Sequence, residues 1–486
     1  MQDLTRRSHR LAVRPRLLPG GRAAIRALAD QALSRAAGAP LVAGNDVRVL
    51  RDAAENYPAW DAAIDGADSS IQVEMYIIRR DRVGRAFVDR LAAKARQGVA
   101  VRVLYDWFGS GTSPALGLFR PLLRAGGEVR VFNPPTFAPA FGWLRRDHRK
   151  LITVDDRVAF VSGLCVSEKW LAQPGRRRLP WRDTGVALRG PVVAHAVEAF
   201  ADMWRLSGGV LPDAPLPAAD SLPEAGPVHV RLVPTEPFTA SMLRLDLLVA
   251  AMARETLWIT DAYFLDHGPY LESLRRAAAD GVDVRLLLPR DSDLGWSVPA
   301  ARTLYRTLLE GGVRVYEWNG SMIHAKTAVV DGRWSRVGST NLNLNSWLGN
   351  WELDVAIEDT RISSTLAAHF EEDLGQATEI VLHHGRRSRN RAPASARTRA
   401  RGSARRVVRA VSGVGRSVGA AVTGSRPLGD YELVPLLSGG LLLVGLAAAA
   451  YAYPSVVVWP AVALAVWTGL SLLGEAMRLW RARGEP

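Results

Sequence analysis

Two short motifs hold the residues of this sequence whose types and spacing are suited to chemistry. In the second half, His324 and Lys326 stand two residues apart, and Ser339 and Asn341 follow a turn predicted at 331–332. Residues two apart on a strand share one face. Imidazole, ammonium, hydroxyl and amide groups on one surface can bind a phosphate group and attack it. We therefore predict a strand that carries a phosphate site with its own nucleophile.

The first half of the chain repeats this pattern. His148 is followed by Lys150 and then by Asp155, as His324 is followed by Lys326 and Asp331. One His-x-Lys pair is common and usually means nothing. Two copies, each after a matching strand and helix, favour a functional interpretation and predict an internal duplication of long period.

The two copies differ in the residues that follow the His-Lys pair. Gly163 and Cys165 stand where the second half has Ser339 and Asn341. A thiol is a poor donor to a phosphoryl oxygen, so the phosphate site is not expected to be symmetric. Cys165 is interpreted equally well as a small buried apolar residue. Asp147, which precedes His148, is expected to raise the pKa of that histidine.

Strands and helices alternate in both halves, and this order predicts two α/β lobes. The helices are recognised by apolar residues at helical spacing and by a glycine after the last turn. The predicted elements are the strands 71–78 and 99–105 around the helix 83–97, and the strands 257–260 and 282–288 around the helix 270–279. A further short helix is predicted over 23–37.

His-x-Lys-x4-Asp followed by Gly-Ser-x-Asn resembles the signature of the phospholipase D superfamily, here duplicated. The wider context is similar to the bacterial cardiolipin synthases from about Asn45 to Leu374. The segments that carry this similarity are Tyr105-Asp106, Trp181 to Thr184, and Phe200 to Trp204. The resemblance implies two pseudo-symmetric α/β lobes that share one active site at their interface. It implies covalent catalysis by histidine, without a metal ion or another cofactor.

By resemblance, His148 is the nucleophile and His324 the general acid and base, although the residues alone leave this order open. Each histidine requires a carboxylate that fixes its tautomer and stabilises the imidazolium. Asp183 and Glu352, one downstream of each motif, match the family positions for that role.

Charge on the phosphoryl oxygens is expected to be neutralised by Lys150, Lys326 and Asn341. The two motif aspartates, Asp155 and Asp331, are expected to hold the geometry between strand and turn. Their predicted role is therefore structural.

The net charge of +14 lies in the flanks of the chain. Residues 1–26 hold seven arginines and one aspartate, and residues 385–429 hold twelve arginines and no acidic residue. The body between them is close to neutral, which argues against an enzyme that tracks duplex nucleic acid and favours attraction to an anionic surface. The single cysteine excludes an internal disulfide.

The end of the chain predicts a membrane anchor. Residues 433–453 and 455–474 are each apolar for about 20 residues, the length that spans a bilayer, and only Pro454 separates them. Arginines flank both ends, so a transmembrane hairpin with the catalytic body on the cytoplasmic side of the inner membrane is expected. Residues 405–422 are interpreted as a basic interfacial helix or as a disordered tether.

These observations predict six regions. They are a basic N-terminal segment (1–44), a first lobe (45–212), a linker (213–227), a second lobe (228–384), an Arg-rich tether (385–427) and a two-helix transmembrane hairpin (428–480). The aromatic and proline-rich loop 132–144 is equally consistent with a packed surface loop and with a lipid-facing lip over the site.

The predicted function is phosphatidyl transfer that makes cardiolipin from phosphatidylglycerol and a second phospholipid through a phosphohistidine. Phosphatidylethanolamine is the other candidate donor. The alternative is a hydrolase with the same site, either a phospholipase D or, more weakly, a nuclease; no specific nucleic-acid partner is expected. A non-enzymatic membrane scaffold is disfavoured by the two intact His-Lys pairs.

Overall fold

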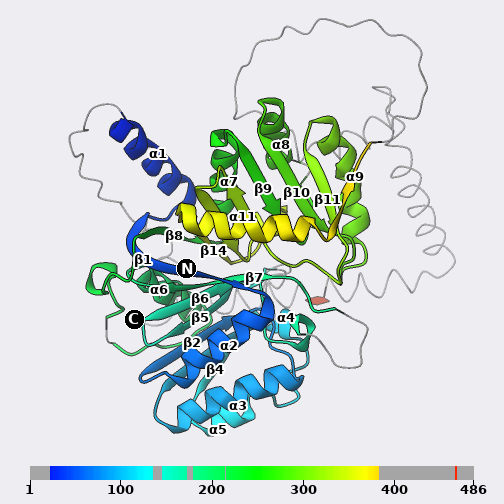
Figure 1. The fold of residues 1–486 in the computed structure, drawn as a ribbon. Helices are drawn as coiled ribbons and strands as arrows, with labels where there is room; N and C mark the ends of the chain where they lie inside the picture. Colours follow the sequence, from blue (N-terminus) through cyan, green and yellow to red (C-terminus); the bar gives the residue numbers. More distant parts are fainter. Residues whose placement is uncertain are drawn as a thin grey trace, which may run out of the picture.

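The structure, a computed structural model, describes residues 22–134, 145–171, 179–213, 215–266, 268–382 and 466–467. Figure 1 shows two α/β lobes, one above the other, with the first half of the chain in blue to teal and the second in green to yellow. The predicted α/β class and the two related lobes are confirmed. Their boundary lies where β1 (Val42–Arg51) meets β8 (Val228–Thr235).

The first lobe contains strands β1 to β7 and the helices around them. Its other strands are β2 (Ser70–Met75), β3 (Ala100–Asp106), β4 (Glu128–Phe132), β5 (Lys150–Val154), β6 (Val158–Ser162) and β7 (Thr184–Arg189). Its helices are α2 (Asp52–Asp65), α3 (Arg82–Arg96), α4 (Trp107–Ser110), α5 (Arg120–Arg124) and α6 (Val192–Leu206), with a short 3-10 turn η2 (Glu168–Trp170). Helix α1 (Arg22–Ala37) precedes β1 in the chain but packs against α7 (Ser241–Met252) of the second lobe, where Leu33 and Ala37 join the core. A second 3-10 turn, η3 (Ala219–Ser221), lies in the linker.

The second lobe repeats this order after the linker. Its other strands are β9 (Thr256–Thr260), β10 (Asp283–Pro289), β11 (Arg314–Trp318), β12 (Thr327–Val330), β13 (Trp334–Gly338), β14 (Glu352–Glu358) and β15 (Ala377–Ile380). Its helices are α7 (Ser241–Met252), α8 (Pro269–Ala279), α9 (Ser297–Glu310), α10 (Leu344–Leu348) and α11 (Thr360–Leu374).

The strands of both lobes join in one sheet with a pseudo-two-fold arrangement. From one edge the order is β4-β3-β2-β5-β6-β7-β1, and after the edge strand β15 the other half reads β11-β10-β9-β12-β13-β14-β8. The two halves meet where β1 pairs antiparallel with β8, at Val42 with Val230 and Asn45 with Val228. The two halves of the chain are therefore related by a pseudo-two-fold axis at the β1–β8 pair. Strands β5 and β12 occupy equivalent positions on the two sides of that axis.

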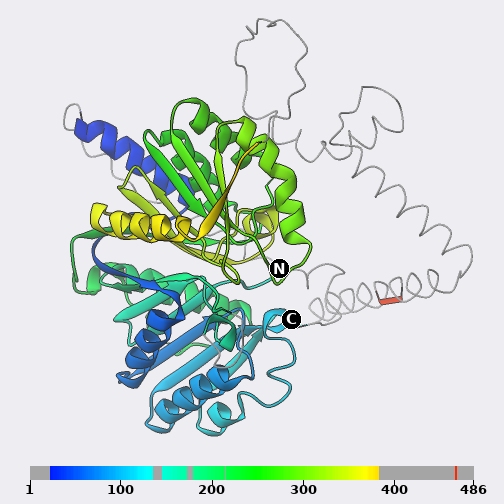
Figure 2. The same cartoon turned by 45° about the vertical axis from the view of Figure 1, so that its right-hand side comes forward.

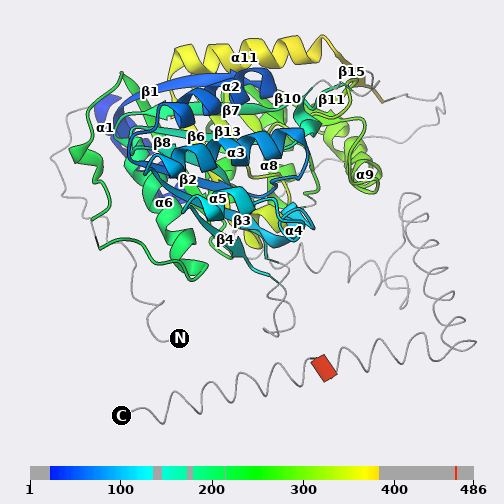
Figure 3. The same cartoon turned by 90° about the horizontal axis from the view of Figure 1, so that it is seen from below.

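The central strands are buried because helices cover both faces of the sheet. Every residue of β5, β6 and β13 is buried. Helices α3 and α8 formed where the apolar spacing predicted them, and the Asp81 carboxylate caps α3 by accepting from the Gly84 amide. Figure 3, seen from below, shows α3 and α5 over the first-lobe strands. Strands with both faces covered are expected to be mostly apolar, as β6 is. The buried Arg336 of β13 is an exception, and it is paired with Asp246 at 2.6 Å.

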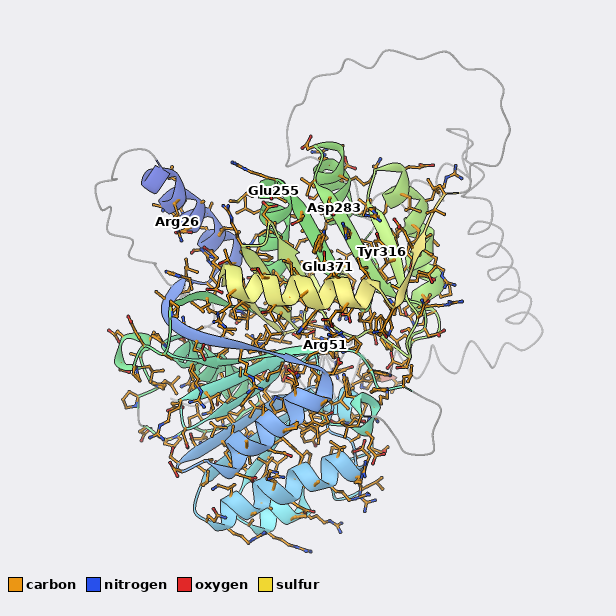
Figure 4. All side chains as sticks on the ribbon, in the orientation of Figure 1. Arg26, Arg51, Glu255, Asp283, Tyr316 and Glu371 are labelled. Carbon is orange, nitrogen blue, oxygen red and sulfur yellow. The ribbon has the colours of Figure 1, made fainter. Side chains whose placement is uncertain are left out.

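Helix α11, yellow in Figures 1 and 2, lies along the boundary between the two lobes and contacts both of them. Asp373, near its end, is 2% exposed. It accepts from Nε of Arg182 at 3.0 Å and from Nη2 of Arg51 at 2.9 Å, and both arginines belong to the first lobe. Figure 4 labels Arg51 at this boundary. A buried carboxylate shared by two guanidinium groups fixes the relative position of the lobes.

Within the described residues, no helix combines the length and the apolar character needed to cross a bilayer. The predicted hairpin and the Arg-rich segment 385–427 lie outside the described residues, except for 466–467. Most of the predicted aromatic loop, residues 135–144, also lies outside them.

Candidate active site

Each His-x-Lys motif is held in place by the lobe opposite its own. The amide of His148 donates to the carbonyl of Trp351 at 2.9 Å, and the amide of His324 donates to the carbonyl of Arg182 at 2.7 Å. These bonds cross the pseudo-two-fold centre in both directions. The two histidines therefore lie at one interface, as the duplicated motif predicted.

The prediction that His324 and Lys326 lie on a strand was wrong in its bounds. Strand β12 begins at Thr327, and only an isolated bridge between Arg182 and Ile323 precedes it. The reason is that the extended stretch around His324 bonds to the other lobe instead of to its own sheet. The shared face is nevertheless retained, because Nζ of Lys326 lies 2.9 Å from Nε2 of His324.

The carboxylates also pair across the lobes. Nδ1 of His148 lies 2.8 Å from Oε2 of Glu352, and Nδ1 of His324 lies 2.7 Å from Oδ2 of Asp183. Both acids are fully buried. Each histidine thus receives its carboxylate from the half of the chain that does not carry it. A carboxylate at Nδ1 keeps the proton there and leaves the lone pair of Nε2 available.

Burial and the paired histidines decide the charge of these acids. Burial alone would raise the pKa of Glu352, but His148 and Lys150 outweigh it and hold that pKa below its ordinary value. Asp183 behaves in the same way, with its pKa lowered by His324 and Lys326 against the effect of burial. Both carboxylates are therefore ionised and can stabilise an imidazolium.

The two carboxylates are oriented by different donors. The hydroxyl of Ser339 donates to Oε2 of Glu352 at 2.6 Å, and the amide of Asn350 donates to its Oε1 at 3.3 Å. On the other side, the indole of Trp170 donates to Oδ2 of Asp183 at 2.9 Å. The sequence reasoning missed Asn350 and Trp170, since neither belongs to the repeated pattern.

Ser339 and Asn341 were predicted to contact phosphate, and the structure places them differently. Ser339 is occupied by Glu352 and also accepts from the amide of Leu353 at 2.9 Å. Asn341 is buried, with its Nδ2 3.5 Å from the hydroxyl of Ser346 and its Oδ1 without a hydrogen-bond partner among the described residues. The Nδ2 amino group of Asn341, which carries two N–H donors, is therefore the part of this side chain that can bind a phosphoryl oxygen, whereas Ser339 orients the carboxylate.

Gly163 and Cys165, which replace the serine and asparagine of the second motif, are accommodated for different reasons. A Cβ atom on Gly163 would lie 2.1 Å from Oδ1 of Asp183, so the glycine leaves room for the carboxylate that serves His324. Cys165 is a free, buried cysteine. Burial raises the pKa of its thiol, which the charge of Lys150 only partly offsets. Its surroundings suit a small neutral residue.

Replacing Gly163 with alanine is expected to lower turnover by about 10²-fold, because Asp183 must move away from Nδ1 of His324. The measurement is kcat on a lipid substrate together with the melting temperature. The matched control is Gly66→Ala, where a Cβ atom would meet no atom nearer than 3.4 Å. Full activity in Gly163→Ala would show that this close approach is unimportant.

The two lysines are buried beside the histidines. Nζ of Lys150 donates to the carbonyl of His148, and Nζ of Lys326 donates to the carbonyl of His324 at 2.5 Å. Burial lowers the pKa of both ammonium groups, and that of Lys326 falls to about 8. Two partly dehydrated cations side by side suit the binding of a phosphate group.

The lowered pKa of Lys326 predicts an alkaline limit to activity. Below pH 8 the ammonium group is charged, and above it the group loses its proton, so kcat/KM is expected to fall about tenfold per pH unit from about pH 8. Rates on a short-chain phosphatidylglycerol between pH 6 and 10 measure this. In Lys326→Arg the guanidinium stays charged, so this limb should vanish even if the rate is lower. A wild-type limb only near the ordinary lysine value of 10.5 would contradict the expectation.

Both histidines are neutral at pH 7. Burial lowers the pKa of His148 and of His324 to about 4, against the opposing effects of Glu352 and Asp183. The expectation that Asp147 raises the pKa of His148 was therefore wrong. The carboxylate of Asp147 accepts from the amide of Arg149 at 3.2 Å, and burial raises its own pKa to about 7.

Asp155 and Asp331 lie at the far ends of the motif strands and serve the backbone. The Asp155 carboxylate accepts from the amides of residues 68, 69 and 70, and the Asp331 carboxylate accepts from those of residues 254, 255 and 256. Both residues have positive φ, 53° and 50°. These contacts support the structural role expected of both.

Aromatic rings surround the histidines. Tyr76 meets the ring of His148 edge-on with 4.8 Å between centroids, and Tyr263 meets His324 at 6.0 Å. Trp181 lies 5.5 Å from His324. Tyr76 follows β2 and Tyr263 follows β9, the second strand of each lobe, so aligning the two halves more closely could have found them. In the described part of the chain no group of three or more His, Cys, Asp or Glu side chains is arranged to hold a metal ion.

Two pseudo-symmetric α/β lobes with one composite site of two histidines and two lysines form the architecture of the phospholipase D-like enzymes. The family model described as "Cardiolipin synthase, PLD-like domain" matches residues 61–174 and 249–374. Phosphatidylserine synthase from Haemophilus influenzae has a similar fold, with a TM-score of 0.55 at 15% identity, over 73% of this chain and 92% of that chain.

Relatives of known family place the chain more narrowly within the phospholipase D-like enzymes. Cardiolipin synthase A of Pseudomonas syringae is 34% identical over 368 residues, which cover 74% of this chain and 74% of that protein. A probable cardiolipin synthase of Bacillus subtilis is 31% identical over 344 residues, which cover 69% and 67%. This chain belongs to the cardiolipin synthase family.

Proposed function

We propose that this protein is a phosphatidyltransferase that makes cardiolipin from phosphatidylglycerol and a second phospholipid. The names of its relatives support the substrate class. The observation that carries the proposal is the pair of buried histidines, His148 and His324, each oriented by a carboxylate of the opposite lobe. A phosphodiester anion repels charged nucleophiles, whereas a neutral imidazole can attack it without adding a second negative charge.

In the first step, Nε2 of His148 attacks the phosphorus and the bond to the headgroup oxygen breaks. His324 gives a proton to that oxygen, so glycerol leaves as a neutral alcohol and a phosphatidyl-histidine remains. His324 can carry this proton because the bound phosphate and Asp183 both favour the imidazolium. Lys150, Lys326 and Asn341 hold the phosphoryl oxygens in our proposal.

In the second step, the hydroxyl of another phosphatidylglycerol headgroup takes the place of the departed glycerol. His324, now neutral, removes its proton, and the oxygen attacks the phosphorus. The bond from phosphorus to Nε2 of His148 breaks and cardiolipin is released. Water in place of the lipid hydroxyl would give phosphatidic acid by the same route, so the acceptor distinguishes transfer from hydrolysis.

The product decides between these outcomes. Purified protein and phosphatidylglycerol, followed by mass spectrometry of the lipids, are expected to yield a four-chain lipid together with free glycerol. Phosphatidic acid as the only new lipid would establish a hydrolase instead. Parallel reactions with phosphatidylethanolamine as donor and phosphatidylglycerol as acceptor test the second candidate donor.

We also propose that residues 428–480 anchor the enzyme in the inner membrane as a two-helix hairpin, with the Arg-rich segment 385–427 toward the anionic cytoplasmic surface. The support is their sequence, which has two apolar runs of spanning length between arginines. Removing 428–486 should shift the body from the membrane fraction to the soluble fraction. A truncated protein that still sediments with membranes in high salt would show that another part anchors it.

A further inference from the structure

Asp293 lies in the loop between β10 and α9, close to His324, and has two partners from different parts of the chain. The hydroxyl of Tyr263 donates to its Oδ1 at 2.6 Å, and Nζ of Lys169 lies 3.3 Å from its Oδ2. Its side chain is still 33% exposed. Lys169 belongs to the first lobe and Asp293 to the second, so this cluster spans the interface on which the histidines lie.

Two aromatic walls connect His324 to this carboxylate. Tyr263 forms one wall, with its ring centroid 6.0 Å from that of His324 and its hydroxyl on Asp293. Trp181 forms the other, 5.5 Å from His324, and Nζ of Lys169 lies 4.5 Å from the centre of its ring. Both walls begin at the histidine that handles the headgroup oxygen; Tyr263 reaches Asp293 directly, and Trp181 reaches it through Lys169.

The chemistry of this cluster suits a ligand that donates hydrogen bonds. Burial alone would raise the pKa of Asp293, but the bond from Tyr263 and the charge of Lys169 outweigh it and hold the pKa below its ordinary value. The carboxylate is therefore ionised at neutral pH. An ionised carboxylate offers about four acceptor positions, of which these contacts use two. Since a carboxylate repels a phosphodiester, the part of the substrate beside it must be neutral or cationic.

We infer that Asp293, held by Tyr263 and Lys169, binds the glycerol hydroxyls of the phosphatidylglycerol headgroup on the His324 side of the phosphorus. The inference rests on the proposed function, in which His324 protonates the departing glycerol. By microscopic reversibility the incoming headgroup occupies the same place, and it still carries a free hydroxyl beside the one that attacks.

The position of Lys169 distinguishes between two donor headgroups. Glycerol presents neutral hydroxyls, whereas ethanolamine presents an ammonium group. An ammonium beside Asp293 would also lie beside the Lys169 ammonium, and like charges this close repel. The cluster therefore favours glycerol over ethanolamine, and removal of the Lys169 charge should weaken that preference.

The His148 side has a different residue at the equivalent position. Aligning Gly98 to Asp106 with Gly281 to Pro289 places Ser110 opposite Asp293. Ser110 is buried, and its hydroxyl accepts from the amide of Ile78 at 3.1 Å and donates to the carbonyl of Tyr76 at 3.3 Å. The carboxylate is thus present only on the His324 side of the pseudo-symmetric site. This difference would orient the bound phosphodiester with its headgroup toward His324.

The test compares three variants on three lipids that differ only in the headgroup: phosphatidylglycerol, phosphatidylethanolamine and phosphatidylmethanol. The variants are Asp293→Asn, Lys169→Met and the control Asp291→Asn, which makes the same change at an exposed residue of the same loop. Release of the headgroup alcohol from mixed micelles gives kcat/KM for each pair. This readout does not depend on which acceptor completes the reaction.

Asp293→Asn is expected to lower kcat/KM for phosphatidylglycerol by about tenfold or more and to leave phosphatidylmethanol, which has no free hydroxyl, nearly unchanged. Lys169→Met is expected to raise the ratio of kcat/KM for phosphatidylethanolamine to kcat/KM for phosphatidylglycerol by about tenfold. Asp291→Asn should match the wild type on all three lipids.

Three results would overturn the inference. Equal losses on all three lipids in Asp293→Asn and Lys169→Met would assign the pair to holding the lobes together, and an unchanged preference in both variants would remove Asp293 from the headgroup site. A wild type that releases glycerol but forms no cardiolipin would instead overturn the proposed transfer while the headgroup comparison still stands. A wild type inactive on all three lipids would contradict both.

Discussion

His324→Asn is expected to react once and stop. With a phosphatidyl ester of p-nitrophenol, whose leaving group needs no protonation, this variant should release about one equivalent of p-nitrophenolate per enzyme and then turn over at least about 10⁴-fold more slowly than the wild type. His148 should by then carry the phosphatidyl group, because the neutral imidazole can attack but no base activates the acceptor. Stopped-flow absorbance and mass spectrometry of the quenched protein measure the burst and the adduct.

His148→Asn is the matched comparison and should show neither burst nor adduct. Both variants should keep the wild-type melting temperature within a few degrees, since asparagine leaves a polar group for the opposing carboxylate. A burst in His148→Asn and its absence in His324→Asn would exchange the two roles. Absence of any adduct in both, with turnover retained, would refute covalent catalysis.

Substitution of the two carboxylates is expected to affect different steps of the reaction. Glu352, the later residue in the chain, should affect the first step, and Asp183, the earlier residue, should affect the second. Glu352→Gln should slow the burst by about 10³-fold, because Glu352 of the second lobe orients His148 of the first. Asp183→Asn should leave the burst with p-nitrophenol largely intact and lower the later turnover by a similar factor, because Asp183 orients His324. Both are nearly isosteric changes, so each serves as the control for the other.

Turnover of natural phosphatidylglycerol should be lost in both variants. In Glu352→Gln the attack by His148 is impaired, and in Asp183→Asn His324 no longer supplies the proton that the departing glycerol requires. A slow burst in Asp183→Asn and a normal burst in Glu352→Gln would mean that each carboxylate serves the histidine of its own lobe. Such a result would contradict the pairing that the structure shows.

The duplication made the fold readable from the sequence. Repeated spacing of apolar residues, with glycines after the helices, placed α3 and α8 and the strands beside them within a few residues. The contacts of the two motif aspartates support the turn-holding role expected of them, because their place at the end of an apolar strand limits what they can touch. These features depend on local sequence, and local sequence was sufficient to predict them.

The pairing inside the site could not be predicted in the same way. His148 and Glu352 are separated by 204 residues, and nothing near either of them indicates that the carboxylate comes from the other lobe. The same applies to Ser339, whose hydroxyl was assigned to phosphate but contacts Glu352. The pKa of His148 was predicted to rise because Asp147 is its neighbour in the chain, whereas burial at the lobe interface lowers it. Each error concerns a quantity that exists only after the lobes meet.

The crossed carboxylates have a consequence for how such a chain can change over time. Two identical subunits around a true two-fold axis would have to accept every substitution on both sides of the phosphate at once. Joining the halves in a single polypeptide removes that restriction. Gly163 with Asp183 on one side, and Ser339 with Glu352 on the other, are alternative solutions to one geometric problem that identical subunits could not hold together. Covalent fusion of the two halves thereby allows the two histidines of the repeated motif to take different roles, one as nucleophile and the other as general acid and base.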